Sequence, residues 1–105
     1  MISYLSLFQL KPEVTPERLE TMMAQTRVLL LRVPEVLAVK TGKRVNPSDE
    51  WPWFVQIEVE SMDKLAICQD DPYYFKFREE VLKPHIAEQE TTAFEMEPQK
   101  NVKYS

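Results

Sequence analysis

The chain has 105 residues with a formal net charge of −4 at pH 7, and 44% of its residues are apolar. The acidic balance argues against a nucleic-acid partner, which would need a basic face for the phosphate backbone. The longest apolar run, residues 28–31, is too short to cross a bilayer, and no basic, apolar leader is evident. The single cysteine, Cys68, excludes an internal disulfide and suits a reducing compartment. We therefore expect one cytoplasmic domain with neither a membrane nor a nucleic-acid partner.

The N-terminal third of the chain predicts a strand followed by a helix. Residues 2–10 alternate as a strand that carries apolar groups on both faces. Thr15 is expected to cap a helix, because the residue after it is a proline, which is favoured at the first helical position. The helical segment is expected to end at Pro34. The apolar stripe of this helix includes Met22 and Met23, which we interpret as core packing rather than as a metal or promiscuous binding surface.

The middle of the chain predicts two further strands and a short helix. The first strand covers residues 36–45 and contains Gly42, the only glycine, which we interpret as a bulge or twist point. A single glycine also argues against a glycine-rich phosphate loop. After a polar connection, residues 51–60 alternate as the next strand, and Ser61 then caps a helix over residues 62–69.

The stretch from Asp71 to His85 is the most distinctive local signal. Asp71 and Pro72 form a helix start, and Pro84 ends the helix. Spacings of 3, 4 and 4 residues place four side chains on one helix face, namely Tyr74, Phe77, Val81 and His85. That face is mostly aromatic and ends in the only histidine of the chain.

The order of these elements predicts an α+β fold. A last strand over residues 91–97 completes the series strand, helix, strand, strand, helices, strand. This is the order of a ferredoxin-like sandwich, which has a four-stranded antiparallel sheet with helices on one face. The domain then covers residues 1–97, and residues 98–105 form a polar tail that is frayed or reaches onto a partner. The second sheet face is too apolar to stay in water, so we expect a homodimer in which two such faces stack.

Several segments carry a family resemblance. They are residues 5–12, residues 14–17, Glu58-x-Glu60-Ser61 and the block from Pro72 to Pro84. Their order and spacing resemble the stress-responsive A/B barrel (Dabb) family of dimeric α+β barrels, over residues 2–97. The resemblance implies a homodimer whose two sheets form a dimeric α/β barrel, with a cleft between sheet and helices in each subunit.

Some members of this family are plant polyketide cyclases, in which histidines and tyrosines of the cleft do acid–base work. The matching positions differ here: Tyr4 and Trp53 stand where the cyclases carry histidine, and Cys68 stands where they carry a tyrosine. The usual His-Pro-x-His block reads Asp71-Pro72-Tyr73-Tyr74. Cyclase chemistry is therefore not implied by the resemblance.

Three functions compete for the cleft, whose predicted ligand-binding residues are Tyr4, Phe8, Trp53, Cys68, Tyr74 and Phe77. The leading hypothesis is a binding protein for a small apolar or aromatic molecule. The second is an enzyme, either a cyclase-like or lyase-like catalyst using Tyr4 or Tyr74 or a cofactor-free oxygenase. The third is a structural dimer whose aromatic side chains fill the cleft. A tyrosine pair would act as acid and base only if its pKa values lay well below about 10.

The remaining reactive side chains indicate no catalytic or metal site. His85 stands alone and is interpreted as binding the last carbonyls of its helix. Cys68 is interpreted as packing, and helix capping explains Asp71. No set of histidine, cysteine and carboxylate side chains has metal-ligand spacing, so we expect neither a metal nor a cofactor.

Overall fold

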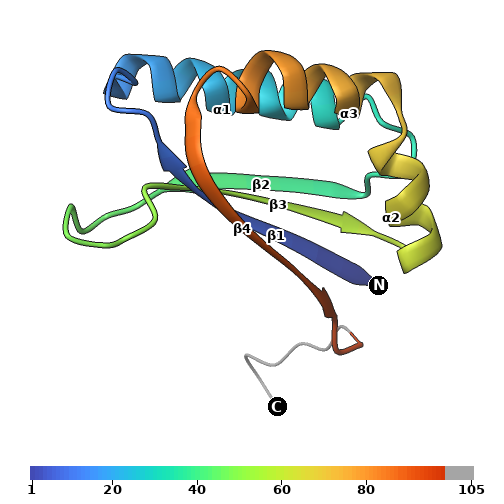
Figure 1. The fold of residues 1–105 in the computed structure, drawn as a ribbon. Coiled ribbons are helices and arrows are strands. Elements are labelled where there is room, and N and C mark those ends of the chain that lie inside the picture. Colours follow the sequence, from blue (N-terminus) through green and yellow to red (C-terminus); the bar gives the residue numbers. More distant parts are fainter. Residues whose placement is uncertain (99–105) are drawn as a thin grey trace.

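Four antiparallel strands form a sheet in the order β2-β3-β1-β4, and helices cover one of its faces (Figure 1). The strands are β1 (Ile2–Leu10), β2 (Ala38–Lys43), β3 (Trp53–Val59) and β4 (Ile86–Glu95). The helices are α1 (Pro16–Leu30), α2 (Met62–Gln69), α3 (Pro72–Lys76) and its continuation, the π-helical segment η1 (Phe77–Leu82). The computed structural model describes residues 1–98, so the predicted tail lies outside the described residues except for Pro98. The predicted ferredoxin-like α+β fold is confirmed.

The helices begin where the sequence predicts them. The side chains of Thr15, Ser61 and Asp71 accept N–H hydrogen bonds from the first turns of α1, α2 and α3, at 3.1, 3.2 and 2.8 Å. Each bond satisfies a backbone donor that has no partner within its helix. A proline follows the cap in both α1 and α3, at a position where a missing N–H costs nothing. Among the described residues, no helix is long and apolar enough to cross a membrane.

The regular helix predicted from Pro72 to Pro84 is wrong in its second half. The N–H of Lys83 donates to the carbonyl of Arg78 at 2.9 Å, which is an i→i+5 bond of a π-helix. The wider turn brings Leu82 to the side of the helix that carries Phe77, and both side chains are buried. His85 ends the segment as predicted, with its Nδ1 lying 2.8 Å from the carbonyl oxygen of Val81.

The strand predicted over residues 91–97 is longer and begins earlier. β4 starts at Ile86, directly after the helical segment, and pairs with β1 along nearly its whole length. The N–H of Lys11 donates to the carbonyl of His85 at 2.8 Å and extends this pairing by one more bond. The register shifts between Gln9, which pairs with Glu88, and Leu10, which pairs with Ile86. Ala87 is therefore the extra residue, and the bulge of the sheet lies in β4. The first half of β4 was missed because residues 88–90 are polar and show no apolar alternation.

Of the two roles predicted for Gly42, a bulge or a twist point, the bulge is wrong, because β2 and β3 pair in continuous register. Gly42 instead makes room for the ring of Phe54 on the neighbouring strand. A Cβ atom at this position would lie 2.8 Å from the Phe54 ring. Both strands are also shorter than predicted, although backbone bonds from Leu37 and Arg44 continue the pairing beyond β2.

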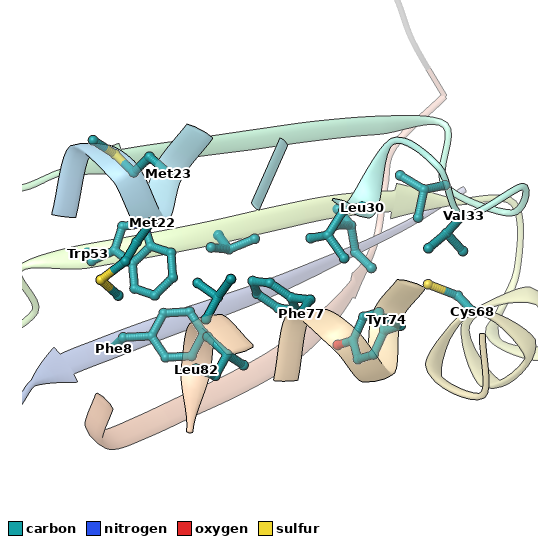
Figure 2. Packing of buried hydrophobic residues seen from close by; sticks show 14 of the residues in the cluster. Phe8, Met22, Met23, Leu30, Val33, Trp53, Cys68, Tyr74, Phe77 and Leu82 are labelled. Carbon is teal, nitrogen blue, oxygen red and sulfur yellow. The ribbon is translucent and has the colours of Figure 1, made fainter. Parts of the chain in front are cut away.

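The core lies between the sheet and the helices. Alternate residues of β3 point toward the helices and are buried there, namely Trp53, Val55, Ile57 and Val59. Figure 2 shows Trp53 and Phe8 lying beside Met22 of α1 at one end of this layer. Met22 and Met23 are both buried in the cluster, so their predicted role as core residues is confirmed.

The opposite face of the sheet carries an apolar stripe formed by Leu5, Leu7, Phe54 and Phe94. No helix within residues 1–98 covers it, and Phe94 is 51% exposed. The face is more polar than the sequence suggested. Charged side chains of Lys40, Glu58, Glu88 and Glu90 flank the stripe.

Candidate functional site

A cavity of about 180 Å³ lies between the helix-facing side of β1 and β4 and the α3–η1 segment. We call it the cleft. It is lined by Tyr4, Ser6, Phe8, Gln69, Tyr74, Phe77, Arg78, Leu82, Gln89 and Thr91. A hollow of about 10 Å³ adjoins it and shares the walls formed by Tyr4 and Tyr74.

The cleft has a buried floor and an exposed mouth. The floor consists of five buried side chains, Ser6, Phe8, Tyr74, Phe77 and Leu82. Arg78, Gln89 and Thr91 are exposed and form the mouth. The pairing of β1 with β4 sets this arrangement, because Thr91 lies opposite Ser6 and Gln89 lies opposite Phe8. Apolar surface inside and polar groups at the entrance are typical of small-molecule sites.

Two elements position the side chains of the floor. The alternation of β1 turns Tyr4, Ser6 and Phe8 toward the helices. On the helical side, the Asp71 cap fixes the start of α3, so Tyr74 faces the sheet in the first turn. The rings of Tyr74 and Phe77 meet edge to face, with centroids 5.9 Å apart and an interplanar angle of 69°. This is a favourable aromatic geometry, and the cleft lies beside the pair.

Four of the six predicted ligand-binding residues line the cleft, namely Tyr4, Phe8, Tyr74 and Phe77. Trp53 does not, although its ring centroid lies 4.6 Å from that of Phe8. It is 1% exposed, and its Nε1–H donates to the hydroxyl of Thr41 at 2.8 Å. Cys68 is fully buried on α2 and also lies outside the lining. Figure 2 shows both residues within the packed layer.

Six lining residues were not predicted, and the reasons differ. Ser6 lies between Tyr4 and Phe8 on the same strand face, so strand alternation alone identifies it. Arg78 follows Tyr74 by four residues, which is the spacing of one helix face. Leu82 enters the lining through the π-turn, for which the sequence carries no recognisable signal. The remaining three depend on how α2 and β4 are placed, namely Gln69, Gln89 and Thr91.

Tyr74 is held in its protonated form. Burial raises the pKa of its phenol well above the ordinary value, and the neighbouring Tyr4 and Cys68 raise it further, whereas Arg78 lowers it. At neutral pH the hydroxyl can therefore donate a hydrogen bond, but it is a poor proton acceptor. This is the opposite of the perturbation that a tyrosine base would need.

Arg78 is the only charged side chain among the described residues that lines the cleft. Its guanidinium lies 5.0 Å from the centroid of the Tyr74 ring, a cation–π distance. One N–H donates to the carbonyl of Gln69 at 3.1 Å. Within residues 1–98 the ion pairs are Lys43 with Glu20 and Lys83 with Glu79, so Arg78 has no carboxylate partner there.

The cysteine and the histidine do not form a catalytic centre. Burial raises the pKa of the Cys68 thiol to about 11, and Glu35 and Asp71 contribute, whereas Arg78 lowers it. The thiol is therefore protonated at neutral pH and is a weak nucleophile. The imidazole of His85 lies against the carbonyl of Val81 and outside the cleft. Among residues 1–98, no group of three or more histidine, cysteine and acidic side chains could hold a metal ion.

Two other hollows lie on the surface. One of about 240 Å³ is formed at the start of α1 by side chains that include Leu10, Val14 and Leu19. Its two cations already have partners, because Lys43 pairs with Glu20 at 2.6 Å and Arg44 donates to a carbonyl at 2.7 Å. The other, of about 1060 Å³, lies at the uncovered sheet face and is bounded by Met1, Lys40, Glu58 and residues 95–98.

Sequence comparison agrees with the fold. The family model of the stress responsive A/B barrel domain, Dabb, matches residues 2–98. The chain belongs to the Dabb family. The resemblance drawn from the order of its segments is thereby confirmed. No curated protein matches the Dabb chain in sequence.

Solved structures share the fold of this Dabb protein at low identity. A dimeric ferredoxin-like protein of unknown function from Thermobifida fusca is 20% identical over 90% of each chain, with a TM-score of 0.81. Hydroxynitrile lyase from Passiflora edulis is 13% identical, covering 94% of this chain and 95% of its own, with a TM-score of 0.79. SnoaB, a cofactor-independent oxygenase from Streptomyces nogalater, is 12% identical, covering 95% and 96%, with a TM-score of 0.73. These similarities show a common fold.

Proposed function

We propose that this Dabb protein binds a small aromatic molecule in the cleft. The observation that carries the proposal is the unfilled volume of about 180 Å³ beside Tyr4 and Tyr74. An apolar protein cavity of roughly 150 Å³ holds one benzene ring, so the cleft has room for a single-ring ligand. Drug-sized ligands need about 300 Å³ or more, so larger ligands do not fit without movement of the walls.

The lining supports an aromatic ligand. Phe8, Tyr74 and Phe77 present ring surfaces to the cavity, and aromatic pairs gain roughly 0.5–1.5 kcal/mol beyond their area burial. The hydroxyls of Ser6 and Tyr74 are the polar groups of the floor and orient the ligand. A structural protein with a filled cleft, the third hypothesis, would have no such cavity.

The proposal includes a homodimer in which two copies of the chain pack through the uncovered sheet face. The apolar stripe of Leu5, Leu7, Phe54 and Phe94 supports this, because a second copy would remove it from water. The relative from Thermobifida fusca is described as dimeric. In sedimentation velocity at micromolar concentration we expect a dimer, and a stable monomer would contradict this part of the proposal.

Binding is tested with phenol as the probe, by isothermal titration calorimetry and ligand-detected NMR. Thr91→Trp places a ring in the mouth of the cleft from an exposed strand position, so we expect it to fold and to weaken phenol binding by about tenfold or more. Val45→Trp is the matched control, because Val45 is 98% exposed and does not line the cleft. Equal phenol affinity in the wild type and Thr91→Trp would contradict the site, and so would an absence of binding in the wild type.

An enzymatic role is the second candidate, and Tyr74 is the observation that favours it. A buried, protonated phenol can donate a hydrogen bond to a substrate oxygen on which negative charge develops. Related structures include a hydroxynitrile lyase and a cofactor-independent oxygenase. For any substrate found, Tyr74→Phe should lower kcat by about a hundredfold or more. Unchanged turnover in Tyr74→Phe would contradict the tyrosine mechanism.

A further inference from the structure

The charge around the cleft differs from that of the whole chain. The protein carries a formal net charge of −4, yet no aspartate or glutamate within residues 1–98 lines the cleft. Among the described residues, the only ionic group in the lining is the guanidinium of Arg78. From the part of the chain that the structure describes, a ligand in this cavity therefore meets one positive charge and no negative charge.

The guanidinium of Arg78 has donors to spare. Arginine carries five N–H donors in a planar fork, and the described contacts use one of them, to the carbonyl of Gln69. The nearest acidic residues along the chain do not neutralise it. Glu79 pairs with Lys83 at 3.5 Å, and Glu80 forms no ion pair among the described residues. The remaining donors are available at the mouth of the cleft.

The ring of Tyr74 fixes where this charge lies. The guanidinium lies 5.0 Å from the ring centroid, so the cation sits over the wall of the cavity at its exposed mouth. Gln89 and Thr91 on β4 complete the mouth and supply further hydrogen-bond donors. An anionic group held there would lie at the polar end of a cavity whose floor is aromatic.

We propose, building on the proposed function, that the ligand is a single-ring organic acid that binds as its carboxylate. The ring lies on the aromatic floor, and the carboxylate binds the fork of Arg78 at the mouth. A carboxylate matches two parallel N–H donors of a guanidinium, a pairing that a lysine cannot reproduce with the same geometry. The volume of about 180 Å³ limits the acid to one ring with short substituents.

The test compares benzoate with its uncharged counterpart benzamide, by calorimetry at fixed salt. The wild type should bind benzoate about tenfold tighter than benzamide, which corresponds to one hydrogen-bonded charge pair at a partly exposed position. Arg78→Gln should bring this ratio close to one. Arg32→Gln is the matched control, because Arg32 also lies over a tyrosine ring, that of Tyr73 at 5.6 Å, but outside the cleft. It should keep the wild-type ratio.

The outcomes separate the two proposals. If phenol and benzamide bind but benzoate has no advantage, or if Arg78→Gln keeps the advantage, the carboxylate inference is overturned and the binding function stands. If Arg32→Gln abolishes the advantage as fully as Arg78→Gln, the effect is one of overall charge, and the inference is again overturned. If none of the three probes binds the wild type, both proposals fail.

Discussion

Trp53→Phe tests whether the structure assigns the cleft correctly, because the sequence placed Trp53 in the ligand site and the geometry places it in the core. The substitution removes the indole Nε1–H that donates to Thr41 at 2.8 Å, which costs about 1 kcal/mol. It also removes part of a ring that is 1% exposed, which costs roughly a further 1–2 kcal/mol in transfer and cavity terms. We expect the free energy of unfolding to fall by about 2–3 kcal/mol.

The assay is urea unfolding followed by far-UV circular dichroism at one fixed protein concentration, since dimerisation would make stability depend on concentration. Thermal unfolding should show a fall in Tm of roughly 10–20 °C. Trp51→Phe is the matched control, because Trp51 lies outside the strands and is only half-buried. Its free energy of unfolding should stay within about 0.5 kcal/mol of the wild type.

The affinity for phenol decides the interpretation. Because Trp53 does not line the cleft, the Kd of phenol in Trp53→Phe should stay within about twofold of the wild type at a temperature where both are folded. A variant with wild-type stability and a strongly weakened affinity would refute this reasoning. It would return Trp53 to the ligand site.

Three other outcomes follow from particular contacts. Leu7→Lys should sediment as a monomer because it charges the apolar stripe. Leu31→Lys, at the 59% exposed C-cap of α1, should remain a dimer. If Leu7→Lys also remained a dimer, the proposed interface would be contradicted. The Cys68 thiol has a raised pKa, so its contribution to stability is complete below the unfolded-state value of about 9 and is lost as pH rises toward about 11. Urea unfolding of Cys68→Ala should therefore show a shallower loss of stability between these pH values than the wild type; identical slopes would contradict the burial argument. Gly42→Ala should lower the free energy of unfolding by about 1 kcal/mol or more, because its Cβ would meet the Phe54 ring at 2.8 Å; an unchanged urea midpoint would show that the ring moves freely.

The parts of the fold that were predicted correctly depend on local signals. The caps at Thr15 and Asp71 act through hydrogen bonds to residues two or three positions away, so the sequence alone locates them. β4 is different. Its first half is polar and is held as a strand by pairing with β1, a contact between distant parts of the chain. No window of local sequence contains that information.

The candidate site shows the same limit. Strand alternation correctly turned Tyr4, Phe8 and Trp53 toward the helices. It does not say where along the sheet each strand lies. In the sheet order β2-β3-β1-β4, β3 with Trp53 lies on the side of β1 away from β4 (Figure 1). The cleft instead lies over β1 and β4, beneath the α3–η1 segment. Arg78 was missed although its spacing from Tyr74 is helical, because an exposed arginine on a helix is ordinarily a solvated residue.

The most direct test of the account is an NMR measurement of where phenol contacts the protein. With methyl-labelled leucine and valine, we predict intermolecular NOEs from the phenol ring to the methyl groups of Leu82, which line the cleft. Val14 reports on the larger hollow at the start of α1 and should show none. NOEs to Val14 without any to Leu82, or no NOEs at saturating phenol, would contradict the assignment of the cleft as the binding site.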